Sequence, residues 1–189
     1  VYKRQVSADG HEWSMGGYAT DYTERTWPPS YGRKASATLP GGASVGVGAF
    51  SHGNHPLFIP DNGYLWDACA RAGLSYRSYG EFVRNTGPVG TPVESLYPAL
   101  QGHFDPDYRT VDHAYRDIAR AEVFLGELAE FEEAGELPQF IVIRIGNNHT
   151  SGTRPGAPTP RAAVADNDLA LGMILDGLSH SRFWDQMCV

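Results

Sequence analysis

Hydrophobic and polar positions fall into helical and strand-like patterns from residue 62 onward. Between residues 64 and 72 the apolar side chains have helical spacing, and Gly73 follows as a stop signal for that helix. The residues with this spacing are Tyr64, Leu65, Ala68 and Cys69. Residues 74–79 then alternate between apolar and polar side chains, as a half-buried strand does. This stretch is predicted to form a helix followed by a strand.

The strongest helical pattern runs over residues 112–134. One apolar stripe is formed by Ile118, Ala121, Leu125 and Leu128, widened by Phe124 and Phe131. Gly135 ends the pattern, and Pro138 blocks its continuation. A second helix is predicted at 162–179, with the buried positions Leu169, Met173, Ile174 and Leu178.

Between the two helices, residues 140–145 are rich in β-branched side chains and predict an interior strand of a parallel or mixed sheet. Phe183 and Trp184 are expected to lead toward another strand. Alternating helices and strands indicate the α/β class, in which ligands bind at the carboxyl ends of the strands. The loop after residue 145, which begins Asn147-Asn148-His149-Thr150, is therefore the first place to look for chemistry.

The rest of the chain is predicted to be loop-rich, because glycine and proline recur through residues 6–60 and 84–111. With 189 residues the chain is long enough for one domain with its own core. A formal net charge of −7 is unfavourable for nucleic-acid binding. The longest apolar stretch, around residues 140–145, is too short to span a bilayer. Two cysteines make no disulfide framework, and Cys69 is expected to be a buried helix residue.

Two polar segments could carry chemistry. The first is Ser7–Ser14, which includes Asp9 and His11, and the second is Asn147–Thr150. Each places a histidine beside hydroxyl or amide groups in what reads as a glycine-containing loop. Taken alone, either pattern fits a solvated surface loop better than a catalytic site, and the Asp9-Gly10 pair also fits an ordinary turn.

Several ordered segments together carry a resemblance to a known family: Val6–Ser14, Tyr18–Tyr22, Gly63–Asp67, Asn147–Gly156 and Thr159–Gly172. They resemble the bacterial phosphoesterase family of the alkaline-phosphatase superfamily, which includes phospholipases C and acid phosphatases. The similar branch is often fused to a β-propeller. The resemblance covers nearly all of residues 6–187. It implies a partial three-layer α/β fold with a mostly parallel central sheet.

The resemblance also implies a mechanism. A serine bound to a divalent metal ion attacks phosphorus, and the covalent phospho-enzyme is then hydrolysed; metal coordination would lower the pKa of an otherwise weak nucleophile. Ser7 is the expected nucleophile and metal contact, although phospholipases of the family tend to have threonine there, and Ser14 is the fallback. Asp9 and His11 would face the same site. The substrate would be a phosphorylated small molecule or a phospholipid.

His149 is the best candidate for a histidine that contacts phosphate or metal, and it is assigned a catalytic role. Asn148 stands where some relatives have aspartate, so its neutral amide is assigned to phosphate rather than to metal. His103 lies in a further shared segment and is a minor candidate for substrate binding. If Ser7 and His149 serve one phosphate, their side chains should lie within roughly 5–8 Å of each other, given hydrogen-bond reach on each side.

Other patterns are weaker. Ser44 lies in a G-x-S-x-G sequence, but a serine-esterase elbow needs a strand before the serine and a helix after it. The His52 and His55 pair lacks a third ligand nearby for zinc. Asp166 and Asp168 are expected to cap the second helix, a buried role for one of them being the less favoured alternative. A non-catalytic α/β binding module or a degenerate relative remains the competing interpretation of the whole chain.

Residues 1–5 and 188–189 are expected to be non-native ends, because they resemble translated sequencing-adaptor sequence. The family's acidic metal ligands are then expected to lie outside these 189 residues, which leaves this stretch inactive by itself. Relatives are usually exported, so the resemblance implies a periplasmic or secreted location.

Overall fold

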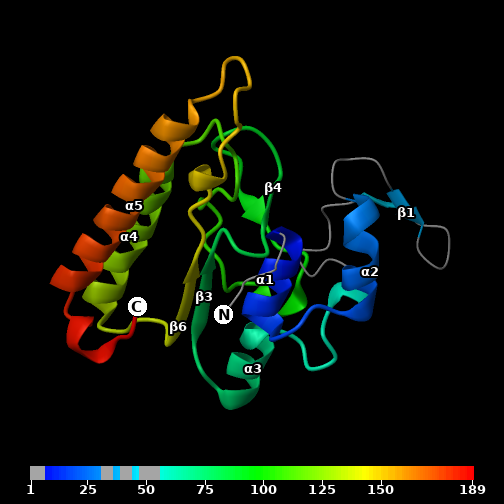
Figure 1. Cartoon of the computed structure of the whole chain (residues 1–189). Coiled ribbons are helices and arrows are strands. Elements are labelled where there is room, and N and C mark those ends of the chain that lie inside the picture. The colour runs from blue at the N-terminus through cyan, green and yellow to red at the C-terminus, as the bar shows by residue number, and fades with distance from the viewer. Residues whose placement is uncertain (1–6, 31–35, 39–43, 47–55) are drawn as a thin grey trace. The chain divides into compact units, whose positions relative to one another are not determined.

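The computed structural model describes residues 7–30, 36–38, 44–46 and 56–189, which form two compact units (Figure 1). The first unit takes in the described residues up to Ser75 together with Ser95–Gln101. The second unit consists of Tyr76–Glu94 and Gly102–Val189.

The first unit contains helices where the sequence predicted loop. Its elements are α1 (Ser7–Gly16), α2 (Asp21–Ser30), the antiparallel strands β1 (Ser36–Thr38) and β2 (Ser44–Gly46), the short 3-10 turns η2 (Pro56–Phe58) and η3 (Pro98–Leu100), and α3 (Leu65–Ala72). The loop prediction was wrong for α1 and α2. The apolar residues of α1 do not recur at helical spacing, and one of its buried side chains is a carboxylate, Glu12, which accepts a hydrogen bond from the Tyr64 hydroxyl at 2.6 Å.

Helix α3 forms where it was predicted. It ends at Gly73, whose φ of 69° is the left-handed conformation that glycine adopts readily. Cys69 is buried, as expected, but Leu65 is 42% exposed. The buried face is centred on Trp66 instead, because this side chain and Tyr64 pack against the ring of Tyr97, at centroid distances of 6.4 Å and 5.0 Å.

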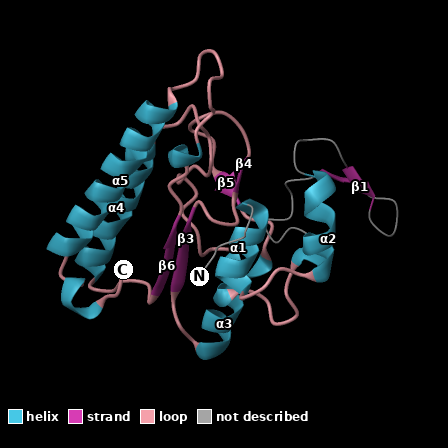
Figure 2. Cartoon of the chain, viewed as in Figure 1, coloured by secondary structure: helices cyan, strands magenta, loops and turns pink. Residues whose placement is uncertain are grey.

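The second unit is a helix pair packed on a parallel strand pair (Figure 2). Strands β3 (Tyr76–Tyr79) and β6 (Phe140–Ile143) are parallel, and Tyr76 pairs with Phe140. Helices α4 (Asp117–Ala134) and α5 (Pro160–His180) pack on each other and on the strands. The other elements are the antiparallel strands β4 (Arg84–Asn85) and β5 (Val93–Glu94), and the 3-10 turns η4 (Asn147–His149) and η5 (Trp184–Gln186).

The mixed α/β class predicted from the sequence is confirmed. Helix α4 ends at Gly135 with a φ of 77°, as predicted, but it begins at Asp117, five residues later than expected. The core of the second unit consists of Tyr79, Tyr108, Ala121, Phe124, Leu128, Ala170, Ile174 and Leu178. Leu169, which was predicted to be buried, is 55% exposed, because α5 turns the alanine at position 170 toward the core. Phe183 and Trp184 lead into η5, not into a strand.

Strand β6 is not an interior strand in the part of the chain that the structure describes. It pairs with β3 alone, and all four of its residues are partly exposed. An open groove of about 870 Å³ lies beside it, lined by Ile141, Ile143 and Ile145 and by apolar side chains of α5. The interior prediction was therefore wrong. A β-branched run shows that a strand buries a face, but it does not report how many of its edges are paired.

Candidate functional site

The carboxyl end of β6 leads directly into η4, which carries His149. The backbone here is held close to β3, because the amide of Arg144 donates to the carbonyl of Tyr79 at 2.8 Å. Gly146 then passes so near to Val111 that a Cβ atom at this position would lie 2.7 Å from the valine Cγ2. Glycine is needed at this point for the chain to turn into η4.

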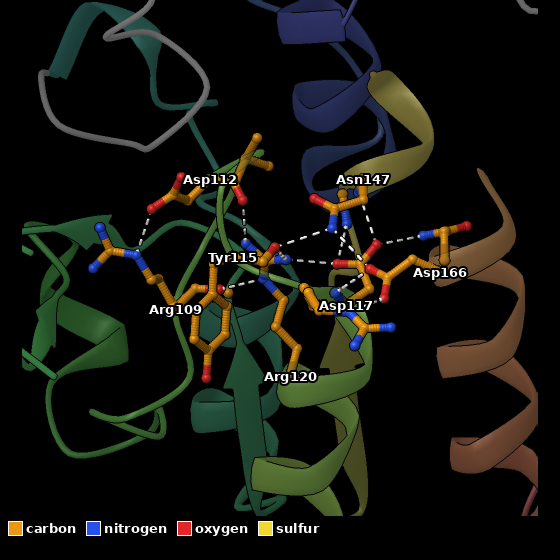
Figure 3. Close-up of polar contacts among 12 residues, drawn as sticks. Arg109, Asp112, Tyr115, Asp117, Arg120, Asn147 and Asp166 are labelled. Atoms are coloured by element: carbon orange, nitrogen blue, oxygen red, sulfur yellow. Dashed lines mark hydrogen bonds and ion pairs between the residues drawn. The ribbon is translucent and has the colours of Figure 1, made fainter. Parts of the chain in front are cut away.

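Asp117, the first residue of α4, fixes the backbone of η4 from below (Figure 3). Its side chain is fully buried. The carboxylate accepts hydrogen bonds from the backbone amides of Gly146 at 3.1 Å and Asn147 at 2.8 Å. It also accepts one from the side-chain amide of Asn167 in α5 at 2.9 Å. A carboxylate with several charge-assisted partners holds its surroundings firmly, so the loop that bears His149 has a rigid support.

Arg120 is the fully buried partner of Asp117, with 2.7 Å between Nη1 and Oδ1. The remaining donors of its guanidinium are directed at a different loop, residues 109–115. They bond the carbonyl oxygens of Arg109, Thr110, Asp112 and Tyr115 at distances from 2.7 to 3.2 Å. The planar, five-donor guanidinium group suits this arrangement. One buried ion pair therefore supports two loops, with the anion on the η4 side and the cation on the 109–115 side (Figure 3).

Asp166 of α5 completes this network, and the expectation that it caps the helix was wrong. Thr159 is the N-cap of α5, and its side chain accepts from the backbone amide of Ala162. Asp166 instead accepts from the backbone amide of Asp117 at 2.6 Å and from the side-chain amide of Asn147 at 3.0 Å. Burial raises the pKa of Asp166, but these bonds and the nearby Arg116 outweigh it, and the net pKa is lowered.

Each of the two supported loops carries a histidine, and the two side chains lie next to each other. His113, from the 109–115 loop, and His149, from η4, have stacked rings with centroids 5.5 Å apart and an angle of 27° between their planes. His149 is exposed, whereas His113 is partly buried, and the Nδ1 atom of His113 is buried without a hydrogen-bond partner among the described residues. Burial lowers the pKa of His113, and the neighbouring His149 and Arg120 lower it further against the opposing effect of Asp112 and Asp117.

The residue after His149 has an uncommon backbone conformation. Thr150 has φ 58° and ψ 164°, a region of the backbone map that β-branched residues rarely occupy. Such a conformation costs on the order of 1–3 kcal/mol and persists only where the surroundings impose it. The strain lies at the end of η4, next to the histidine pair.

The predicted site residues fall in three places. Ser7, Asp9 and His11 lie on α1 of the first unit, in a helix and not in the expected loop. His149 and the exposed Asn148 lie at the carboxyl end of β6 in the second unit. The structure does not place the two units relative to each other, so the convergence of Ser7 and His149 stays a prediction.

The structure does not bring His103 to the same place as His149. Its ring stacks on Tyr76 at a centroid distance of 4.2 Å, and its Nδ1 lies 3.3 Å from the carbonyl oxygen of that residue. Tyr76 is the first residue of β3, so His103 lies at the amino end of the parallel pair. His149 follows the carboxyl end of β6.

The weaker patterns gain no support. Ser44 is the first residue of β2, in antiparallel register with Thr38, whereas an esterase elbow places its serine after a strand. His52 and His55 lie outside the described residues. In the part of the chain that the structure describes, no group of three or more histidine, cysteine, aspartate or glutamate side chains could hold a metal ion. None of the described helices combines the length and the apolar character that crossing a membrane requires.

Sequence reasoning missed His113, Asp117 and Arg120. Placing the start of the helix at residue 112 put His113 inside a predicted helix, although it belongs to the loop before α4. One available signal was the charged pair Asp117 and Arg120, three residues apart at the beginning of the apolar stripe. Comparison with known proteins found no matching family model, no similar curated protein and no similar solved structure.

Proposed function

We propose that this chain belongs to a metal-dependent phosphoester hydrolase and that the carboxyl end of β6 contributes its phosphate-contacting part. The observation that carries the proposal is the position of His149. It lies where a parallel strand pair ends, on a turn held by the buried Asp117, beside the ring of His113. Rigid support and a location at the strand ends are properties of ligand sites in α/β proteins.

The chemistry of these side chains suits a phosphate ester. A phosphate monoester carries nearly two negative charges at neutral pH and offers three acceptor oxygens. An imidazole N–H of His149 can donate to one oxygen, and the exposed amide of Asn148 can donate to another. A protonated His149 could also give its proton to the departing alcohol, which is the work of a general acid.

The remaining parts of the proposal rest on the resemblance described above. Ser7 would be the nucleophile and a metal contact, with Asp9 and His11 near the substrate. The finer fold would be a three-layer sandwich with a mostly parallel sheet, in an exported protein that can carry a β-propeller. Among the described residues, no group of three or more histidine, cysteine, aspartate or glutamate side chains could hold the divalent ion.

Phosphate binding to the 189-residue chain tests the proposal. Adding inorganic phosphate at pH 6 should shift the imidazole NMR signals of His149, and His149→Ala should remove binding. The matched control is His180→Ala, because His180 is exposed at the end of α5 and outside the site. Unchanged His149 signals at tens of millimolar phosphate would reject the proposal.

Hydrolysis is the second measurement. We expect the chain alone not to hydrolyse p-nitrophenyl phosphate with divalent metal present, because no group of three or more histidine, cysteine, aspartate or glutamate side chains among the described residues could hold the metal ion. Turnover that a chelator abolishes would contradict this expectation. In a full-length enzyme, His149→Ala should lower turnover roughly 10²–10⁴-fold, the range for one positioned proton donor. Ser7→Ala should abolish it.

A further inference from the structure

The ring beside His149 belongs to a residue that no sequence pattern marked as functional. His113 comes from a separate loop, its ring is stacked 5.5 Å from that of His149, and its buried Nδ1 lacks a partner among the described residues. Buried polar atoms in native structures are nearly always hydrogen-bonded, so one without a protein partner calls for an explanation. We propose that His113 is the second histidine of this site and that it binds the same phosphate as His149. This inference rests on the proposed function.

The support beneath the rings favours a joint role. The loop of His113 is fixed through its carbonyl oxygens by Arg120, and the turn of His149 is fixed through its amides by Asp117. Because Asp117 and Arg120 are bonded to each other at 2.7 Å with both side chains fully buried, the two loops share one rigid base. The spacing of the two rings is therefore set by the core of the unit and not by chance contact of two free loops.

The charges around the pair indicate what kind of ligand belongs there. The groups that act electrostatically on His113 are His149, Arg120, Asp112 and Asp117. Without ligand, burial and the first two of these hold the pKa of His113 below its ordinary value. A dianion next to the ring of His113 would favour the protonated form of that ring. Affinity for such a ligand should therefore rise as the pH falls from about 7 toward 5.5, because binding takes up protons.

Isothermal titration with inorganic phosphate at pH 6 tests the inference. The variants are His113→Ala, His149→Ala, the double variant and the control His180→Ala. Each site variant should weaken phosphate binding roughly 10- to 100-fold, the scale for one charge-assisted hydrogen bond. The double variant should lose less than the product of the two single losses, because the two rings are in contact and act on one ligand. Sulfate keeps both charges between pH 7 and 5.5, whereas phosphate takes up a proton in this range. Sulfate affinity should therefore rise as the pH falls and report the protonation of the protein alone.

The outcomes separate this inference from the proposed function. If His149→Ala weakens binding and His113→Ala does not, the role of His113 is rejected and the proposed function stands. If the unmodified chain binds no phosphate, the proposed function fails and this inference fails with it. Should His113→Ala not fold, the imidazole nitrogen shifts of His113 in the unmodified chain give the answer: they must respond to phosphate together with those of His149.

Discussion

Replacing Asp117 with asparagine should destabilise the second unit strongly. Oδ1 of the aspartate accepts from Gly146 and Arg120, and Oδ2 accepts from Asn147 and Asn167. In asparagine one of these two oxygens is replaced by an NH₂ group. The two donors that bonded this oxygen in the unmodified chain would then face another donor. The guanidinium of Arg120 also loses its buried counter-charge, although it keeps its bonds to backbone carbonyls. Breaking a buried ion pair by removing one partner costs about 3–5 kcal/mol, and we expect Asp117→Asn to fall in this range.

Urea unfolding of the unmodified chain and of Asp117→Asn measures this loss. The matched control is Arg116→Gln, one residue earlier. The Arg116 side chain is 67% exposed and pairs with Asp166 at 3.1 Å, so its loss should cost no more than about 1 kcal/mol. Backbone amides of Gly146 and Asn147 should also exchange with solvent faster in Asp117→Asn. If the aspartate variant loses no more stability than the control, the view of Asp117 as the support of η4 is incorrect.

Three further predictions concern the same region. Gly146→Ala should lower the free energy of unfolding, measured in urea, by about 1–3 kcal/mol, because the new methyl group would lie 2.7 Å from Cγ2 of Val111. The control Gly126→Ala, at an open position of α4, should raise it by about 1 kcal/mol. Thr150→Gly should raise the melting temperature by relieving the positive φ, and a lower value would show that no strain is stored there. The lowered pKa of His113 means that the unfolded chain binds its proton more readily. The stability that this residue contributes is present above pH 6.5 and is lost as the pH falls through the pKa of His113 in the folded chain. In His113→Gln the free energy of unfolding should therefore vary less with pH below 6.5.

The sequence was most informative where one face of an element is buried and its end is marked by glycine. Helix α3 ends at Gly73 and helix α4 at Gly135, as predicted, because the left-handed backbone at these points favours glycine over other residues. The sequence was least informative for α1, where a buried carboxylate takes a place that an apolar side chain would normally hold. Glu12 reads as a surface residue until its partner, the hydroxyl of Tyr64, is known.

In the candidate site, too, the sequence located the residue marked by its neighbours along the chain and misread the one whose role depends on distant residues. His149 could be located from sequence alone, because a polar segment directly after a β-branched strand marks the carboxyl end of that strand. Asp166 was read as a helix cap, since local sequence shows only its distance from the helix start. Its actual role depends on Asn147 and on the amide of Asp117, which are distant in sequence and become neighbours only through the packing of α4 on α5.

His113 shows most clearly what a local pattern cannot contain. Nothing in its neighbours along the chain distinguishes it from a solvated histidine before a helix, and its importance comes entirely from a ring 36 residues away. That proximity depends on Arg120, whose guanidinium donates to the carbonyl of Asp112 before His113 and to the carbonyl of Tyr115 after it. Arg120 can be buried only because Asp117 neutralises it, and Asp117 in turn holds the backbone of η4. A charged pair three residues apart at the start of an otherwise apolar stripe is thus the sequence feature that links the two histidines.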